Sequence, residues 1–201
     1  KKTFFATLWT AGSRMAVRFI GIISLVILAK ILGPEDYGLV GKAAVIYGFL
    51  ELITELGLES ALITNQKATK DHYSTAWTIH IIRGMLIALI LVAIAKPASA
   101  FMNEMQLEQI FYCYAGISFF RGFYNIGVVD FRKNMTFSKD FYYSLYNKIA
   151  GFVVTLTVAF IWETFWALIA GLAASMVAGI ISSFIMSPMR PKLSLKEFDS
   201  L

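Results

Sequence analysis

The sequence predicts an all-α integral membrane protein, built as a bundle of six transmembrane helices. Of its 201 residues, 58% are hydrophobic and 15% are charged, whereas a soluble domain is about half apolar and about a quarter charged. The apolar stretches also reach or approach the roughly 20 residues that a helix needs to cross the hydrocarbon core of a bilayer. A soluble protein with a very apolar core would keep its apolar runs short, so the membrane interpretation is favoured.

Six spans are expected, because residues that end helices separate six apolar stretches. A turn at residues 33–38, with the sequence Gly-Pro-Glu-Asp-Tyr-Gly, divides the first two, since proline fixes φ and glycine tolerates unusual backbone angles. Pro97 is expected to end the third span. Residues 162–164 form a short hairpin between the last two. The predicted spans are residues 8–32, 39–64, 73–95, 105–128, 142–161 and 165–186.

The basic residues indicate how the spans are oriented. The net charge is +5, and the basic residues flank apolar spans, so they point to membrane topology rather than to a nucleic-acid partner. One set of loops holds ten of them and the other holds three, and cytoplasmic loops are the ones enriched in Lys and Arg. Both termini are therefore expected in the cytoplasm. The segment 130–143, which is basic and aromatic, is expected to form a short interfacial helix on that face. The ten are Lys1, Lys2, Lys67, Lys70, Arg132, Lys133, Lys139, Arg190, Lys192 and Lys196, and the three are Lys30, Lys42 and Lys96.

Several predicted spans carry charged side chains. On the first span, Arg14 and Arg18 lie one turn apart on one helix face. Acidic residues follow one another at intervals of four on the second span. Glu59 is placed near the cytoplasmic interface together with Lys148, where snorkelling or a simple ion pair explains both. The polar residues of the later spans are Glu51, Glu55 and Glu59 on the second, His80 and Arg83 on the third, Arg121 and Asn125 on the fourth, and Asn147 and Lys148 on the fifth.

These charged side chains are not expected to face lipid, because a charge in lipid is energetically costly. A charged side chain at the centre of a transmembrane helix costs about 2.5–3.5 kcal/mol on insertion scales, so six of them would cost roughly 15–20 kcal/mol. They are therefore expected to face a bundle interior or a hydrated cavity. Depth in the membrane can be estimated by counting residues from the turn between the first two spans, at 1.5 Å per residue. By this count Arg18 lies at the same depth as Glu51, and Arg14 at the same depth as Glu55. We predict that these two pairs form across the first two helices.

Arginine outnumbers acid near the middle of the spans, which predicts an anion-binding site. A net-positive cavity attracts anions, and the planar guanidinium group suits phosphate. Glu51 and Glu55 are then expected to serve as ion-pairing or coupling groups. The sequence contains no P-loop, dinucleotide fingerprint, HExxH or CxxC motif, so we expect no enzyme activity, no metal and no cofactor. The predicted anion-binding residues are Arg14, Arg18, Arg83 and Arg121.

The sixth span has a different pattern, in which small residues recur every four positions. Such a stripe lets two helix backbones approach closely. We interpret it as a packing surface. Its members are Ala167, Gly171, Ser175, Gly179 and Ser183.

Three segments carry a resemblance to a known family. Residues 28–38, Leu-Ala-Lys-Ile-Leu-Gly-Pro-Glu-Asp-Tyr-Gly, resemble the turn after the first helix of oligosaccharide flippases (Wzx-like, polysaccharide transporter family). Residues 55–63, Glu-Leu-Gly-Leu-Glu-Ser-Ala-Leu-Ile, are similar to the end of that family's second helix. Residues 130–137, Asp-Phe-Arg-Lys-Asn-Met-Thr-Phe, are similar to its basic stretch before the fifth helix. The resemblance covers most of the chain.

This resemblance implies the fold of the multidrug/oligosaccharidyl-lipid/polysaccharide exporters, in which two six-helix lobes surround a central cavity. Residues 1–189 would then be the N-terminal lobe, and residues 190–201 a cytoplasmic tail that leads to a second lobe. The implied function is alternating-access flipping of a polyprenyl-diphosphate-linked oligosaccharide across the bacterial plasma (inner) membrane, for lipopolysaccharide or exopolysaccharide biosynthesis. The arginines would hold the diphosphate. The implied partners are the lipid-linked oligosaccharide, membrane lipid, and polysaccharide polymerase or other assembly proteins.

Two alternatives remain open. A cation-coupled drug antiporter of the same superfamily should favour acids over arginines in its cavity, because its substrates are usually cationic. A non-transporting scaffold, or a membrane-embedded enzyme of polysaccharide assembly, is the other, and the missing catalytic motif argues against the enzyme. A second set of six spans after residue 201 would favour the transporter.

Overall fold

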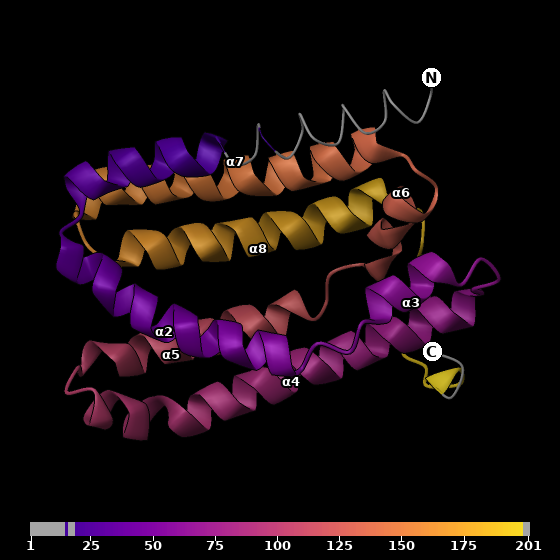
Figure 1. Ribbon diagram of the computed structural model, residues 1–201, viewed down its shortest axis with the longest axis horizontal. Coiled ribbons are helices and arrows are strands. Elements are labelled where there is room, and N and C mark those ends of the chain that lie inside the picture. The colour runs from indigo at the N-terminus through magenta and orange to yellow at the C-terminus, as the bar shows by residue number, and fades with distance from the viewer. Residues whose placement is uncertain (1–14, 16–18, 199–201) are drawn as a thin grey trace.

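The computed structural model describes residue 15 and residues 19–198, and every regular element within them is a helix (Figure 1). This confirms the prediction of an all-α protein. The first helix includes Phe19–Ile31. It is followed by α2 (Pro34–Ile53), α3 (Leu58–Thr64), α4 (Lys70–Phe101), α5 (Gln106–Arg121), the 3₁₀ helix η1 (Ile126–Val129), α6 (Asp130–Lys133), α7 (Phe137–Trp162) and α8 (Trp166–Met186).

Three of the described helices, α4, α7 and α8, are long and apolar enough to cross a membrane. The described part of the first helix is apolar but shorter. Large apolar side chains are exposed along the first helix, α2, α4 and α7, as expected for surfaces that face lipid or another membrane segment. The chain is therefore an all-α membrane protein, and the count of six spans stays a prediction.

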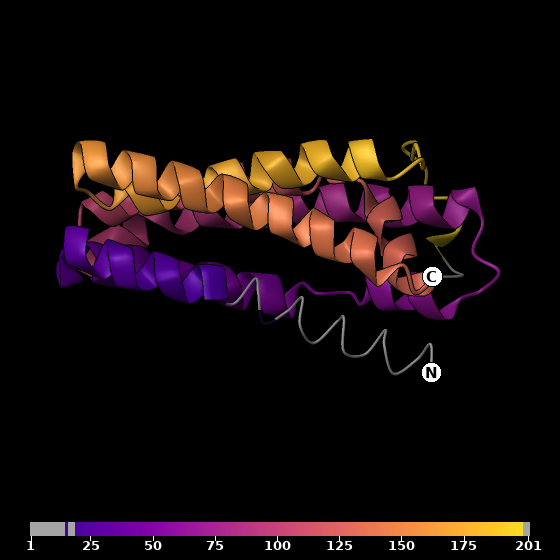
Figure 2. The same ribbon diagram turned by 90° about the horizontal axis from the view of Figure 1, so that it is seen from above.

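The helices lie lengthwise beside one another, with α7 along α8 and α4 along α5 as the two most extensive pairs. Figures 1 and 2 show the first helix beside α7, with α2 crossing toward α5. Close backbone approach explains why glycines lie at both main contacts. A Cβ added at Gly84 of α4 would lie 2.7 Å from the carbonyl oxygen of Ser118 in α5. A Cβ at Gly151 of α7 would lie 3.0 Å from the carbonyl oxygen of Gly171 in α8, so small residues of the α8 stripe pack against α7.

The predicted turn at residues 33–38 is wrong in extent, because residues 34–38 already belong to α2, whereas the predicted hairpin at residues 162–164 forms. Pro34 is the first residue of α2, a position where its missing N–H is no loss. The carboxylate of Asp36 accepts a hydrogen bond from the backbone N–H of Phe165 at 3.1 Å, which ties the start of α2 to the α7–α8 hairpin. That hairpin turns at Glu163, whose φ is 49°.

The prediction that Pro97 ends the third span is wrong, because α4 continues through it to Phe101. Within a helix, proline removes its own backbone donor, and its ring crowds the carbonyl of the residue four positions earlier. The last turn is still closed by the bond from the N–H of Met102 to the carbonyl of Ala98 at 3.0 Å. A proline one turn from a helix end therefore costs little regular structure.

Other predicted boundaries also differ from the structure. The second span is not one helix, since α2 ends at Ile53 and α3 begins at Leu58. The fourth is shorter, because α5 ends at Arg121. The segment 130–143 is not one interfacial helix: its first residues form α6, and its last seven belong to α7. Polar residues occur on both sides of these points, inside the helices as well as between them, so composition alone does not reveal where the helices break.

Loops that the sequence predicts to be cytoplasmic lie together at one end of the bundle. The ammonium group of Lys133 donates to the carbonyl of Asn65 at 2.8 Å, joining the turn after α6 to the loop after α3. The segment after α8 also reaches this end, where the N–H of Lys192 donates to Ser74 in α4. At the other end, Lys42 pairs with Glu104 at 3.0 Å. The side of the membrane that each end faces stays a prediction.

Candidate functional site

A cavity of about 950 Å³ lies between α2 and α3 on one side and α4, α5, α7 and α8 on the others. It contains most of the charged side chains that the sequence places within spans. Polar tyrosines and small residues of α8 complete its wall. The charged lining residues are Glu51, Glu55, Glu59, Arg83, Arg121 and Arg132.

The break between α2 and α3 determines where the acidic residues lie. Gly57 has φ 65° and ψ 15°, a left-handed conformation that glycine adopts without penalty. The hydroxyl of Thr54 donates to the carbonyl of Leu50 at 2.6 Å and so satisfies one end of α2. Because of this break, Glu51, Glu55 and Glu59 do not form the single helical stripe that the sequence predicts. Glu51 lies in the last turn of α2, Glu55 lies in the break, and Glu59 lies on α3.

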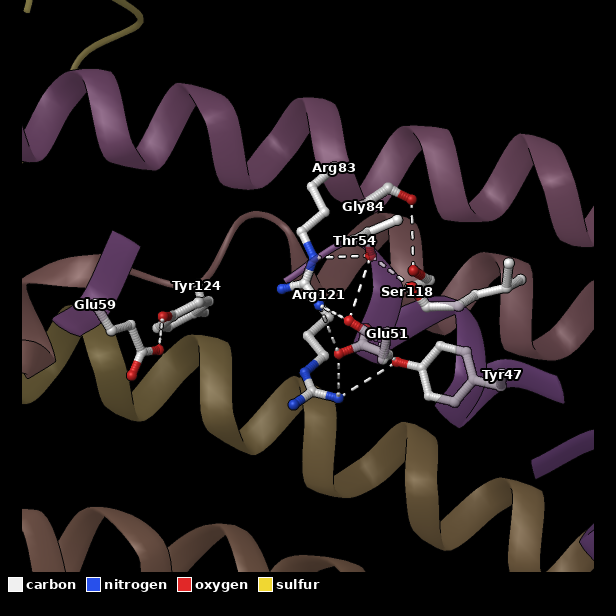
Figure 3. Close-up of polar contacts among 10 residues, drawn as sticks. Tyr47, Glu51, Thr54, Glu59, Arg83, Gly84, Ser118, Arg121 and Tyr124 are labelled. Atoms are coloured by element: carbon white, nitrogen blue, oxygen red, sulfur yellow. Dashed lines mark hydrogen bonds and ion pairs between the residues drawn. The ribbon is translucent and has the colours of Figure 1, made fainter. Parts of the chain in front are cut away.

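Glu51 is the centre of the cavity's main polar cluster (Figure 3). Its carboxylate accepts a hydrogen bond from Arg83 Nη2 at 3.2 Å and one from the Tyr47 hydroxyl at 3.0 Å. Arg121 Nη1 lies 3.9 Å from the same carboxylate and donates to the Tyr47 oxygen at 3.3 Å. Arg83 is held further by bonds to the Glu51 carbonyl at 2.7 Å and to Thr54 Oγ1 at 3.1 Å. One acid from α2 therefore receives two arginines, from α4 and α5.

The two arginines differ in how firmly they are held. The side chain of Arg83 is 15% exposed, and that of Glu51 is 25% exposed, so the direct pair is largely shielded from solvent. Arg121 is 58% exposed and makes the longer contact. The sequence predicts both as unpaired positive charge, and the structure corrects this, because both contact Glu51. Two guanidinium groups share this carboxylate, but the described lining of the whole cavity has three guanidinium groups and three carboxylates. The predicted excess of positive charge is therefore not found among the described residues.

The predicted partners Arg14 and Arg18 lie outside the described residues. Their pairing with Glu55 and Glu51 stays a prediction. Glu55 itself lines the cavity, and among the described residues no ion pair or side-chain hydrogen bond engages its carboxylate.

A second polar cluster closes the basic end of the cavity. Glu59 of α3 accepts hydrogen bonds from the Tyr124 hydroxyl and, at 3.1 Å, from Arg132 Nη1. Arg132 Nε also donates to Asp140 in α7 at 3.1 Å. Burial alone would lower the pKa of Arg132, but Asp140 and Glu59 outweigh it and raise that pKa. This arginine, which the sequence counts only as a loop cation, therefore links α3, α6 and α7.

With this geometry in view, comparisons with known proteins identify the family. A family model described as "Polysaccharide biosynthesis protein" matches residues 27–201. The chain belongs to this polysaccharide biosynthesis family. The predicted resemblance is thereby confirmed. No solved structure matches the chain significantly.

Two relatives of this family member are similar over part of their length. A Rhizobium meliloti (strain 1021) protein named succinoglycan biosynthesis transport protein ExoT is 22% identical over 184 residues, which are 92% of this chain and 37% of that protein. A Klebsiella pneumoniae protein named as an uncharacterized membrane protein in the cps region is 26% identical over 107 residues, 53% of this chain and 22% of that protein. The chain thus spans less than half the length of either relative.

Polar residues on the later helices take different places in this polysaccharide biosynthesis protein. His80 packs edge-on against Tyr124, with ring centroids 5.2 Å apart, in the cavity wall. Asn147 also lines the cavity and accepts a hydrogen bond from Ser182 at 3.0 Å. Asn125 does not lie on the fourth helix. It is fully buried beyond the end of α5, where its amide donates to the Met189 carbonyl at 2.7 Å.

The predicted place of Lys148 near the interface stays a prediction. Because α7 begins at Phe137, Lys148 is near the middle of a 26-residue helix. It lines a separate, smaller cavity rather than the one around Glu51.

Sequence patterns miss several members of the main site. Tyr47 lies one turn before Glu51, and Thr54 lies three residues after it, so the spacing i−4 and i+3 around an in-span acid is the available signal. Tyr124 and Arg132 are harder to find, because they join the site only through the fold. Among the described residues there is no group of three or more His, Cys, Asp or Glu side chains that could hold a metal ion.

Proposed function

We propose that this chain is the N-terminal lobe, residues 1–189, of a two-lobed transporter with six transmembrane helices per lobe. The transporter would flip a polyprenyl-diphosphate-linked oligosaccharide across the bacterial inner membrane by alternating access, with both termini of this lobe in the cytoplasm. Membership of the polysaccharide biosynthesis family supports the pathway. The name of the Rhizobium relative, a biosynthesis transport protein, supports transport rather than catalysis.

The observation that carries this proposal is the pair of arginines on one acid inside the cavity. Arg83 is fixed by three hydrogen bonds to Glu51 and Thr54. Arg121 is more exposed and makes a longer contact, so its guanidinium group is the one free to turn to a ligand. When Arg121 leaves Glu51 and binds a diphosphate, it would exchange one anionic partner for another. This exchange limits the free-energy cost of desolvating the arginine.

The lipid-linked substrate would divide between two environments. Its diphosphate and first sugars would occupy the polar cavity, and its polyprenyl chain would stay in the bilayer. Arg14 and Arg18 are proposed as further diphosphate ligands, since their sequence positions put them at the depth of Glu51 and Glu55. Membrane lipid and a polysaccharide polymerase are the proposed partners of the whole protein.

Export measured in cells tests this proposal. We expect Arg121→Gln in the full-length protein to lower surface polysaccharide roughly 10- to 100-fold, because one charge-assisted hydrogen bond contributes about 1.5–3 kcal/mol. Arg121→Lys should retain part of the activity. The matched control is Lys96→Gln, which also removes one positive charge, but from an exposed residue near the C-terminal end of α4. Normal export by the double variant Arg83→Gln/Arg121→Gln, at normal protein level, would refute the diphosphate role.

Glu55 supports a second candidate function. A carboxylate in a membrane cavity, with no described ion pair, could bind a coupling proton or sodium ion, as acids in spans often do. That arrangement also fits a cation-coupled drug antiporter. Transport of organic cations by the full-length protein, abolished by Glu55→Gln, would favour the antiporter. Absence of such transport, together with loss of export in the arginine variants, would favour the flippase.

A further inference from the structure

The segment after α8, residues 187–198, runs to the start of α4 and is held there by its backbone (Figure 1). Three of its N–H groups donate hydrogen bonds to side-chain hydroxyl groups of α4, and all three hydroxyl-bearing residues are buried. The course of the segment is therefore fixed through its own backbone. The donors are Lys192, Ser194 and Glu197, and their acceptors are Ser74 at 3.3 Å, Thr78 at 2.9 Å and Thr75 at 3.3 Å.

The side chains that this segment exposes are apolar and basic. Leu193, Leu195 and Phe198 are 72%, 52% and 63% exposed. The basic side chains are exposed as well, and none of them forms an ion pair with a described residue. The one acid of the segment, Glu197, has a carboxylate oxygen 3.8 Å from His72 Nε2. The basic residues are Arg190, Lys192 and Lys196.

Exposed charges at the start of α4 add to this positive surface. Lys70 is the first residue of α4, and Lys67 lies in the loop before it. Asp71 is the exposed acid beside them. Among the described residues of the segment and of this end of α4, five cations therefore stand against Asp71 and Glu197. The surface carries a net positive charge.

The depth of the segment follows from the helix on which it lies. Residues 85–95 of α4 are uninterrupted apolar residues, and Lys96 follows them. Counting back from Lys96 by the roughly 20 residues that cross the hydrocarbon core reaches about residue 76. Ser74 and Thr75 therefore lie just beyond the core, at the depth of the lipid headgroups. The segment bonded to them lies at the same depth.

We propose that the segment after α8 binds anionic phospholipids at the surface of the membrane. Its basic side chains would contact the lipid phosphates, and Leu193, Leu195 and Phe198 would insert between the upper parts of the lipid chains. Charge complementarity favours this partner, because basic residues at a membrane surface attract anionic lipids, and apolar side chains beside them strengthen the contact. A protein surface that covered the segment would instead need acidic groups, and its contact would not depend on the charge of the lipid. The proposal is independent of the function proposed above.

An environment-sensitive fluorophore at residue 195 of the full-length protein tests this surface. Leu195→Cys is labelled in a background without other cysteines, and the protein is placed in nanodiscs of phosphatidylcholine, with or without part of the lipid replaced by phosphatidylglycerol. We expect phosphatidylglycerol to raise the ratio of membrane-inserted to water-exposed probe at least about tenfold, since each nearby basic residue contributes about fivefold. High salt should remove this rise, because the Debye length falls to about 3 Å at 1 M. A probe at Gln66, an exposed polar residue in the loop after α3, should stay in water throughout.

Matched charge variants separate the segment from the rest of the protein. Lys192→Gln/Lys196→Gln keeps the backbone bonds to α4 and should lower the inserted ratio in phosphatidylglycerol roughly 25-fold. Lys30→Gln/Lys96→Gln removes the same charge from exposed residues elsewhere and should leave the ratio unchanged. A probe inserted equally in both lipids and at any salt would show that a protein surface covers the segment, and would overturn the proposal. A probe in water in both lipids, or equal effects of the two double variants, would overturn it as well.

Discussion

Replacing Glu51 by Gln should destabilise the protein, because it removes the shared counter-charge of two arginines. The Arg83 and Glu51 side chains are 15% and 25% exposed, and removing one partner from a buried ion pair costs about 3–5 kcal/mol. Arg83 would keep its bonds to the Glu51 carbonyl and to Thr54, so we expect about 2–3 kcal/mol. The Arg121 contact is longer and 58% exposed, and it adds no more than about 1 kcal/mol.

Equilibrium unfolding of the purified full-length protein in SDS measures this loss, with tryptophan fluorescence as the signal. The matched control is Glu108→Gln. It removes another carboxylate that accepts a tyrosine hydrogen bond, from Tyr112 at 2.9 Å, but that has no arginine partner among the described residues. A double-mutant cycle with Arg83→Gln isolates the pair, and the double variant should be more stable than the sum of the single losses predicts. If Glu51→Gln costs no more than Glu108→Gln, or if the two losses simply add, the ion-pair reasoning is wrong.

Two packing predictions use the helix contacts directly. Gly84→Ala should cost about 1–3 kcal/mol, because its Cβ would lie 2.7 Å from the Ser118 carbonyl oxygen. Gly116→Ala, which meets nothing within 4 Å, should be neutral or stabilising. Gly171→Ala should also lower the unfolding midpoint, since its Cβ would lie 1.7 Å from Thr155 Oγ1. Adding Thr155→Ala to Gly171→Ala should raise the unfolding midpoint part of the way back. If the midpoint does not rise, contact with the backbone rather than with the Thr155 side chain limits the packing.

Helix turns were the most predictable part of the fold, because their causes are local. A helix boundary next to Gly33 and Pro34 was expected, although α2 starts at Pro34 itself rather than at residue 39, and the Trp-Glu-Thr hairpin joins the last two helices. Pro97 shows the limit of such rules, since a helix-breaking residue one turn from a natural end changes little. The break after Ile53 was missed, because it depends on the left-handed conformation of Gly57, which the sequence does not reveal.

The candidate site was predictable in its residue types but not in its pairing. Charge within apolar spans selected Glu51, Arg83 and Arg121, and all three meet in one cluster. Depth counting paired Glu51 with Arg18, which lies outside the described residues, and did not predict the partners from α4 and α5 that the structure shows. Depth along the membrane can be counted from a sequence, but the rotation of each helix cannot.

The sequence by itself determined that this protein lies in a membrane and which charged residues its apolar spans contain. Composition placed it in a membrane, and the expense of charge in lipid required an enclosed polar site near its arginines. Tertiary structure alone decided which carboxylate meets which guanidinium group, that Arg132 closes one end of the cavity, and that Lys148 stands apart in a cavity of its own. The reason is that these contacts depend on helix breaks and helix rotation, which packing across the whole bundle determines.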